Sequence, residues 1–231
     1  MTDHPGQTAI QKVVATVDEA VAVVRDGDVV MFGGFGGAGF PFALRDALSR
    51  TKVKDLTLIG NNADFGCLAE IDCIRRLICS YPSGPTSKPV LERIEAGEIE
   101  LLVTPQGTLA EQIRAAGAGL GGVLTPTGLG TELAARWEAI ERGGKQYLLV
   151  PPLRANVAFI KATVADTIGN LFLRAASKNF NPLMAMAADL TIVEAETIVE
   201  PGGIDPDHVH VPSVFVSKVV QADRYVEPVS R

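Results

Sequence analysis

The stretch that decides the fold is Val29-Val30-Met31-Phe32-Gly33-Gly34-Phe35-Gly36-Gly37-Ala38-Gly39-Phe40-Pro41. Its first four residues are uncharged and mostly β-branched or aromatic, which predicts a buried parallel strand. Five of the next seven residues are glycine, so the backbone can turn sharply and approach a ligand. Pro41 suits the first position of a helix, and residues 42–48 continue with helical periodicity. The pattern therefore predicts a strand, a glycine loop and a helix whose N-terminus could receive an anion.

Two interpretations of this loop compete on the pattern alone. Residues 34–39 match the dinucleotide fingerprint G-x-G-x-x-G, but that site also needs an acidic residue at the end of the second strand. The second strand here is followed by Asn61 and Asn62, and Asp64 comes late, which argues against a nicotinamide cofactor. The other interpretation is a tight strand-to-helix turn without a ligand.

Strands and helices alternate along most of the chain. Apolar runs predict strands at residues 53–59, 75–81, 99–104, 146–151, 157–161, 190–193 and 214–220, and helical patterns fall at residues 20–25, 42–48, 90–97, 108–116 and 183–188. This alternation predicts one α/β domain over residues 1–231, an open and mostly parallel sheet with helices on both faces. After residue 146 the strands follow one another more closely, which favours some antiparallel pairing.

Polar residues follow two of the predicted strands. Asn61 and Asn62 come directly after the second strand, and Gln106 lies in the short loop between residues 99–104 and a helix that a Thr108–Glu111 capping box would start. The carboxyl ends of parallel strands meet at one edge of the sheet, where open α/β sheets bind ligands. We therefore expect these three side chains near the glycine loop. The alternative interpretation is that these side chains only form local hydrogen bonds that stabilise turns.

Two later segments have weaker patterns. Residues 117–131 hold too many glycines for regular structure, and we expect them to wrap over the same edge of the sheet. Residues 132–143 are polar and predict a mobile excursion or a short helix. The motif His208-Val209-His210 lies between aspartates but has no third ligand at a metal-site spacing, so a polar loop is the favoured interpretation and no metal is expected.

Composition excludes several classes of protein. The net charge of −6 argues against a nucleic-acid binder, because no basic face is available for phosphates. The three cysteines form no C-x-x-C pair, so we expect free thiols in a reducing cytoplasm. The first residues, Met1 to Gly6, are polar and predict no signal peptide. No apolar run approaches the length of a membrane span.

Several motifs in order resemble those of family I CoA-transferases, in the chain usually called alpha. The glycine loop and the residues before it resemble the family signature. Further matching segments are residues 101–111 (LLVTPQGTLAE), 117–131, 177–182 (SKNFNP) and 191–194 (TIVE). Residues 133–138 depart from the "EGKE"-like stretch of many relatives, so the resemblance gives no conformation for residues 132–144.

The resemblance implies ping-pong transfer of CoA between an acyl-CoA and a carboxylic acid, through a glutamyl-CoA thioester. The nucleophilic glutamate belongs to the beta subunit, in a Ser-Glu-Asn-Gly type motif that this chain lacks. The implied assembly is an alpha–beta pair, doubled to α2β2. CoA is then a substrate, and no tightly bound cofactor is expected. The roles implied here are Gln106 as an oxyanion donor, Asn61 and Asn62 as substrate contacts, and as a cradle for CoA the residues Gly33, Gly34, Phe35, Gly36, Gly37, Ala38 and Gly39.

Two other functions remain open at this point, and so does the acceptor acid. One is a CoA-thioester hydrolase on the same scaffold, with water in place of the second acid. The other is a non-catalytic dinucleotide-binding module.

Residues 148–156 and 119–122 resemble the acetoacetate and short-chain fatty acid branch of the family, which includes acetate and butyrate. Residues 78–82 resemble the 3-oxoadipate branch.

Overall fold

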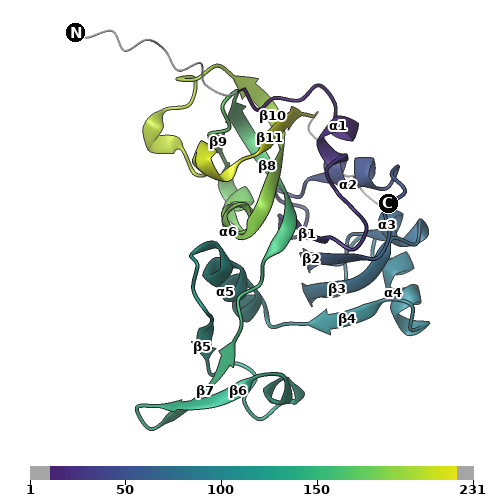
Figure 1. The fold of residues 1–231 in the computed structure, drawn as a ribbon, viewed down its shortest axis with the longest axis vertical. Coiled ribbons are helices and arrows are strands. Elements are labelled where there is room, and N and C mark those ends of the chain that lie inside the picture. The colour runs from purple at the N-terminus through teal and green to yellow at the C-terminus, as the bar shows by residue number, and fades with distance from the viewer. Residues whose placement is uncertain (1–10, 223–231) are drawn as a thin grey trace.

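The computed structural model describes residues 11–222, and it has a large α/β body with a small lobe below it (Figure 1). The expectation about Met1 to Gly6 lies outside the described residues. The strands of the body are β1 (Val29–Phe32), β2 (Leu56–Asn62), β3 (Ile74–Tyr81), β4 (Glu100–Val103), β8 (Ala155–Asp166), β9 (Leu171–Phe172), β10 (Ala188–Val199) and β11 (Lys218–Gln221). The helices are α1 (Val17–Val21), α2 (Phe42–Leu48), α3 (Gly66–Glu70), α4 (Lys88–Glu95), α5 (Gln106–Gly117) and α6 (Asn181–Ala187).

The body is built on one eight-stranded sheet in the order β11-β10-β8-β1-β2-β3-β4, with β9 paired to β8. Its pairs are parallel except for the β8–β9 hairpin. β1 lies inside the sheet, where Val30 stands opposite Leu58 of β2 and Val157 of β8. The predicted mostly parallel sheet is therefore confirmed, and the loop after β1 leaves the sheet between two neighbouring strands.

Two apolar layers cover the sheet. Phe32 points into a core shared with Ala20, Leu44 and Leu68 of α1 to α3. Its neighbour Met31 points into the other core, which includes buried side chains of α5 and α6. Alternate residues of a strand face opposite sides of a sheet, so the uncharged run of β1 is explained by burial on both faces. Helices on both faces are thus confirmed.

The small lobe is a second sheet, whereas the sequence predicts a single one; the strand predicted at residues 146–151 and the antiparallel pairing expected there are confirmed. It is antiparallel, in the order β5-β7-β6, formed by β5 (Val123–Thr125), β6 (Glu138–Arg142) and β7 (Lys145–Val150). The expectation that residues 117–131 lack regular structure was wrong, because residues 123–125 pair with β7. Residues 132–143 form the 3₁₀ helix η1 (Glu132–Arg136) and then β6. The tight turn Gly143-Gly144, with both φ angles positive, joins β6 to β7.

Two predicted element boundaries near the candidate site were wrong. β2 runs on to Asn62, so the two asparagines belong to the strand instead of following it. α5 begins at Gln106, and Thr108 does not cap it: the Thr108 hydroxyl is buried without a hydrogen-bond partner. The helix predicted at residues 20–25 lies earlier in the chain: α1 spans Val17–Val21, and the Thr16 hydroxyl caps it by accepting from Glu19 N.

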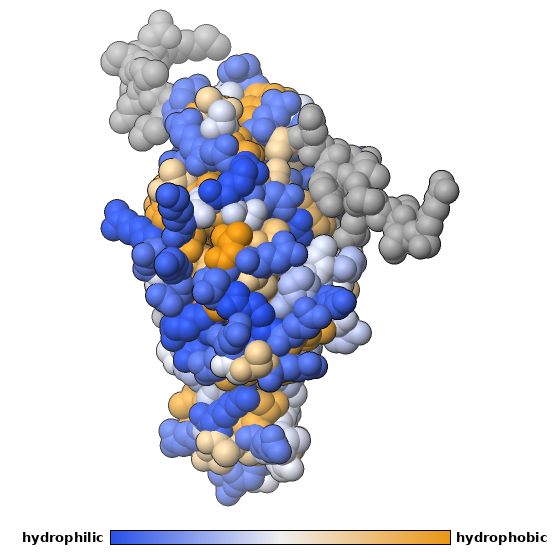
Figure 2. Space-filling model, turned by 90° about the vertical axis from the view of Figure 1, so that its right-hand side faces the viewer, coloured by the Kyte–Doolittle hydropathy of each residue, from blue (hydrophilic) through white to orange (hydrophobic). Residues whose placement is uncertain are grey.

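The outer face over α3 and α4 is mostly hydrophilic, with apolar residues in small separate groups (Figure 2). No described helix is long and apolar enough to cross a bilayer.

The three cysteines are free, and burial raises the pKa of the Cys73 and Cys79 thiols to about 12. These two thiols are therefore structural and poorly reactive.

Candidate active site

Three amide side chains predicted from the sequence meet in one hydrogen-bonded network at the carboxyl ends of β2 and β3. Gln106 Nε2 donates to Asn61 Oδ1 at 2.6 Å, and Asn61 Nδ2 donates to Asn62 Oδ1 at 2.6 Å. Ser80 of β3 also donates to Asn61 Oδ1, at 2.7 Å. Asn61 is buried, with 4% of its surface exposed, while Gln106 is exposed. The buried asparagine therefore holds the exposed glutamine amide in one orientation.

The glycine loop joins the same network. Gly36 N donates to Asn62 Oδ1 at 3.3 Å. The tip of the loop is closed by two backbone hydrogen bonds between Phe35 and Ala38, in both directions. The structure thus brings together the loop, Asn61, Asn62 and Gln106, which come from three segments of the sequence.

Only the tip of the glycine loop reaches the surface. Phe35 and Gly36 are exposed and Gly37 and Ala38 are half-buried, whereas Gly33, Gly34 and Gly39 are buried. At Gly34, φ is +103° and an added Cβ would lie 2.7 Å from the Phe40 backbone. Gly34 therefore has a packing reason of its own, and residues 35–38 are the part of the loop that is exposed or half-buried.

The N-terminus of α2 holds a carboxylate of the protein itself. Glu194 Oε2 accepts from Ala43 N at 2.8 Å and from Leu44 N at 3.2 Å, and Glu194 Oε1 accepts from Lys161 Nζ at 2.9 Å. Glu194 is fully buried and Lys161 nearly so. The expectation that this helix end is open to an external anion was wrong, because Glu194, about 150 residues away in sequence, fills it. The same finding weakens the dinucleotide interpretation, which needs the helix end for pyrophosphate.

Two adjacent pockets open beside the network. One is lined by Phe35, Asn61, Asn62, Ser80, Tyr81 and Gln106. The other is more apolar and is lined by Phe35, Gln106, Gly107, Ala110, Asn179, Phe180 and Leu183. None of these residues is a carboxylate, imidazole, thiol or cation. The pockets thus offer neutral amide donors, the hydroxyls of Ser80 and Tyr81 and apolar walls, but no carboxylate.

Sequence reasoning missed several of these residues. Ser80 and Tyr81 end β3, the strand next to β2, so the edge argument that selected Asn61 also applies to them. Asn179 and Phe180 come from a distant segment, and only the fold places them beside Gln106.

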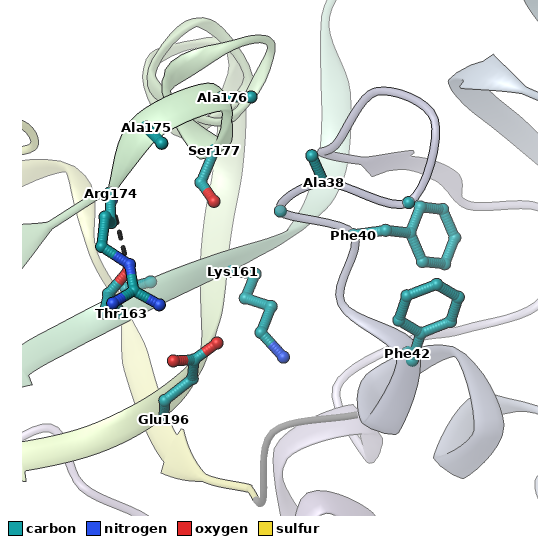
Figure 3. A pocket seen from close by; sticks show the side chains of 13 residues that line it. Ala38, Phe40, Phe42, Lys161, Thr163, Arg174, Ala175, Ala176, Ser177 and Glu196 are labelled. Carbon is teal, nitrogen blue, oxygen red and sulfur yellow. Dashed lines mark hydrogen bonds between the residues drawn. The ribbon is translucent and has the colours of Figure 1, made fainter. Parts of the chain in front are cut away.

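A third pocket lies beside the returning half of the glycine loop (Figure 3). Ala38 and Phe40 line it on the loop side, Ser177 and Arg174 on the opposite side, and Lys161 below them. Its Glu196 carboxylate stands near the cations in the same view. The pocket has charges of both signs, which does not single out one kind of ligand.

The residues that the structure describes contain no group of three or more His, Cys, Asp or Glu side chains placed to hold a metal ion. His210 Nδ1 instead accepts from Leu173 N at 3.0 Å. Burial lowers the pKa of His210, with Lys178 and His208 adding to the effect. This histidine therefore acts as a neutral acceptor that joins two loops.

The chemistry open to the network is stabilisation of a developing oxyanion. A glutamine amide has two N–H donors, and the hydrogen bond to Asn61 uses one of them. The second N–H of Gln106, which lines both pockets, is available to an oxygen atom of a ligand. A fixed donor beside apolar walls stabilises an oxyanion more than mobile water does.

Comparisons with known proteins agree with one another. The family model described as Coenzyme A transferase matches residues 14–222. The A-subunit of 3-oxoadipate CoA-transferase from Pseudomonas putida is 44% identical over 216 residues, which cover 91% of this chain and 94% of that one. The A-subunit of succinyl-CoA:3-ketoacid coenzyme A transferase from Helicobacter pylori strain J99 is 39% identical over 227 residues, covering 96% and 97%.

A solved structure shows the same fold. It is an acyl-CoA transferase from Escherichia coli O157:H7 in a thioester complex with CoA, with a TM-score of 0.84 and 21% identity. The match covers 99% of this chain and 50% of that one. This chain therefore spans about half the length of the first solved structures it matches.

Proposed function

We propose, from the premise that this chain belongs to the coenzyme A transferase family, that it is the alpha subunit of a two-chain enzyme that moves CoA between an acyl-CoA and a carboxylic acid. One observation carries the proposal: the pockets beside Gln106 present oriented amide donors but no carboxylate that could attack a thioester. Each of the two relatives is named as one subunit of its enzyme, which implies a second kind of chain. In this proposal the partner supplies a glutamate, and an α2β2 assembly is the expected form.

The reaction needs a carboxylate to attack the thioester carbonyl. In the proposed sequence the partner's glutamate attacks and CoA thiolate leaves. The thiolate then attacks the glutamyl carbonyl of the resulting anhydride, so that the first acid is released and a glutamyl-CoA thioester remains. The acceptor carboxylate then attacks the glutamyl-CoA thioester, and the same steps in reverse give its CoA ester and the free glutamate. Covalent catalysis of this kind divides one difficult exchange into easier ones.

Residues of this chain would stabilise and position the reacting groups. We assign to Gln106 the donation to the oxyanion, with Asn61 fixing its amide. Asn62 would contact the substrate beside Asn61, because both line the same pocket. The exposed loop tip, residues 35–38, would lie along the acyl-CoA. CoA is a substrate in this scheme, and its phosphates need local cations or the partner's surface, because the net charge of the chain is −6.

The acceptor acid is drawn from two groups, 3-oxoacids such as acetoacetate and short carboxylates such as acetate or butyrate. The two relatives described above carry different substrate names, 3-oxoadipate and 3-ketoacid. The named relatives thus support a CoA-transferase more strongly than any one acceptor.

Free buried thiols support a reducing, cytoplasmic location.

We expect succinyl-CoA and acetoacetate to be converted only when this chain is mixed with its candidate beta subunit. The pockets beside Gln106 hold no carboxylate, so the isolated chain should be silent. The absorbance of acetoacetyl-CoA measures the conversion directly. Acyl-CoA loss by the mixture without any acceptor acid would favour the hydrolase alternative. Turnover by this chain alone would contradict the two-chain proposal.

A further inference from the structure

The buried asparagine Asn181, the first residue of α6, connects three segments around the glycine loop. It is 0% exposed. Its Nδ2 donates to Gly39 O at 3.0 Å and to Ser177 O at 2.9 Å, and its Oδ1 accepts from Lys161 N at 3.2 Å. Asn181 lines none of the three pockets described above. It is therefore placed to hold the loop without touching a ligand.

The loop is shaped around this amide. A Cβ on Gly33 would lie 1.8 Å from Asn181 Oδ1, and a Cβ on Gly39 would lie 2.6 Å from Asn181 Nδ2. Gly33 and Gly39 are the two ends of the glycine loop. Both ends thus pack against the same side chain, at a distance that only glycine permits.

A second asparagine holds the neighbouring carbonyl. Asn179 Nδ2 donates to Ala38 O at 2.9 Å, so the consecutive carbonyls of Ala38 and Gly39 are held by two side chains from one segment. In Figure 3 this returning half of the loop faces Ser177 across the pocket. Because a peptide unit is planar, fixing these two carbonyls fixes the planes of both peptides.

The other half of the loop connects with Gln106. Gly36 N donates to Asn62, Asn62 accepts from Asn61, and Asn61 accepts from Gln106. A displacement of the loop would therefore shift the hydrogen-bonded chain that orients the Gln106 amide. Hydrogen bonds in such a chain are coupled and cannot be apportioned from single deletions.

We propose that Asn181, assisted by Asn179, is a positioning residue for CoA transfer that acts through the glycine loop on Gln106. The proposal rests on the transferase function proposed above. It assigns to Asn181 no contact with substrate. Loss of its amide lets the loop move and disorders the oxyanion donor, which lowers kcat more than it changes KM.

The test uses the assembled two-chain enzyme with Asn181→Ala and Asn181→Asp. Aspartate keeps the size and the acceptor for Lys161 N but replaces the donor to Gly39 O. We expect kcat to fall about tenfold to a hundredfold in both variants, with KM changed less than about threefold. Asn170→Ala is the control asparagine variant, because the hydrogen bonds of Asn170 to other described residues are within the β8–β9 turn and to Ser213 N, and its kcat should stay at the wild-type value.

A double-mutant cycle separates positioning from general destabilisation. In a Gln106→Ala background, Asn181→Ala should cost less than about threefold, because the group it positions is already gone. If the double variant instead loses kcat by the product of the two single-variant factors, the proposal is overturned. Failure of both Asn181 variants to assemble while Asn170→Ala assembles normally would also overturn it, since that result assigns Asn181 to folding alone. An inactive wild-type complex would instead refute the transferase function itself.

Discussion

Gln106→Ala in the assembled enzyme is expected to lower kcat by about a hundredfold to a thousandfold, the usual loss for one oxyanion donor. Gln106 is the exposed amide whose orientation is fixed by Asn61, and in the proposed mechanism its other N–H donates to the acyl oxygen. Its removal leaves Asn61 bonded to Ser80, so assembly should be unchanged. Steady-state kinetics on the purified complex measures the effect.

Two variants control this experiment. Gln106→Glu keeps the shape but replaces the donor by a carboxylate, and it should lose as much activity as the alanine variant. Gln146→Ala, in the small sheet, removes an exposed glutamine that donates to Glu141 at 3.3 Å, and it should retain full activity. An unchanged turnover number for Gln106→Ala would contradict the role given to this residue.

Lys161→Met is expected to destabilise the protein by about 3 kcal/mol, the lower end of the range for breaking a buried ion pair. The variant leaves the fully buried Glu194 carboxylate without its cation. The two amides at the start of α2 still donate to Glu194, which keeps the loss from being larger. Urea unfolding followed by circular dichroism gives the free energy.

The loss becomes smaller when both partners are neutralised. Lys161→Met combined with Glu194→Gln should recover part of the lost stability, because no uncompensated charge remains buried and the glutamine oxygen can still accept from Ala43 N and Leu44 N. Lys88→Met removes an exposed pair with Glu92, 3.8 Å apart, and should cost less than about 0.5 kcal/mol. Equal losses for Lys161→Met and Lys88→Met would show that burial does not govern the Lys161–Glu194 pair.

The parts predicted correctly from sequence are those set by local pattern. β1 and α2 have the predicted bounds, because an uncharged apolar run and a helical repeat determine their own structure. The grouping of Asn61 and Gln106 with the glycine loop followed from sheet topology, since strand ends of a parallel sheet share one edge. These features need no knowledge of distant contacts.

The parts predicted wrongly depend on contacts between distant residues. Asn61 and Asn62 favour a turn, yet β3 pairs with them and extends β2. Residues 123–125 become a strand only because β7 lies alongside. The α2 N-terminus is open to a ligand in the sequence pattern, but Glu194 of β10 lies against it. Asn181 gave no signal of its own, because its role comes from packing against Gly33.

In the proposed enzyme the partner chain, and not this one, carries the nucleophile. Intact-mass spectrometry of both chains, after the complex is treated with acyl-CoA and without an acceptor acid, tests this claim most directly. The covalent glutamyl-CoA adduct is predicted on the partner chain, with this chain at its unmodified mass. An adduct on this chain would contradict the claim and place a nucleophile among its own residues.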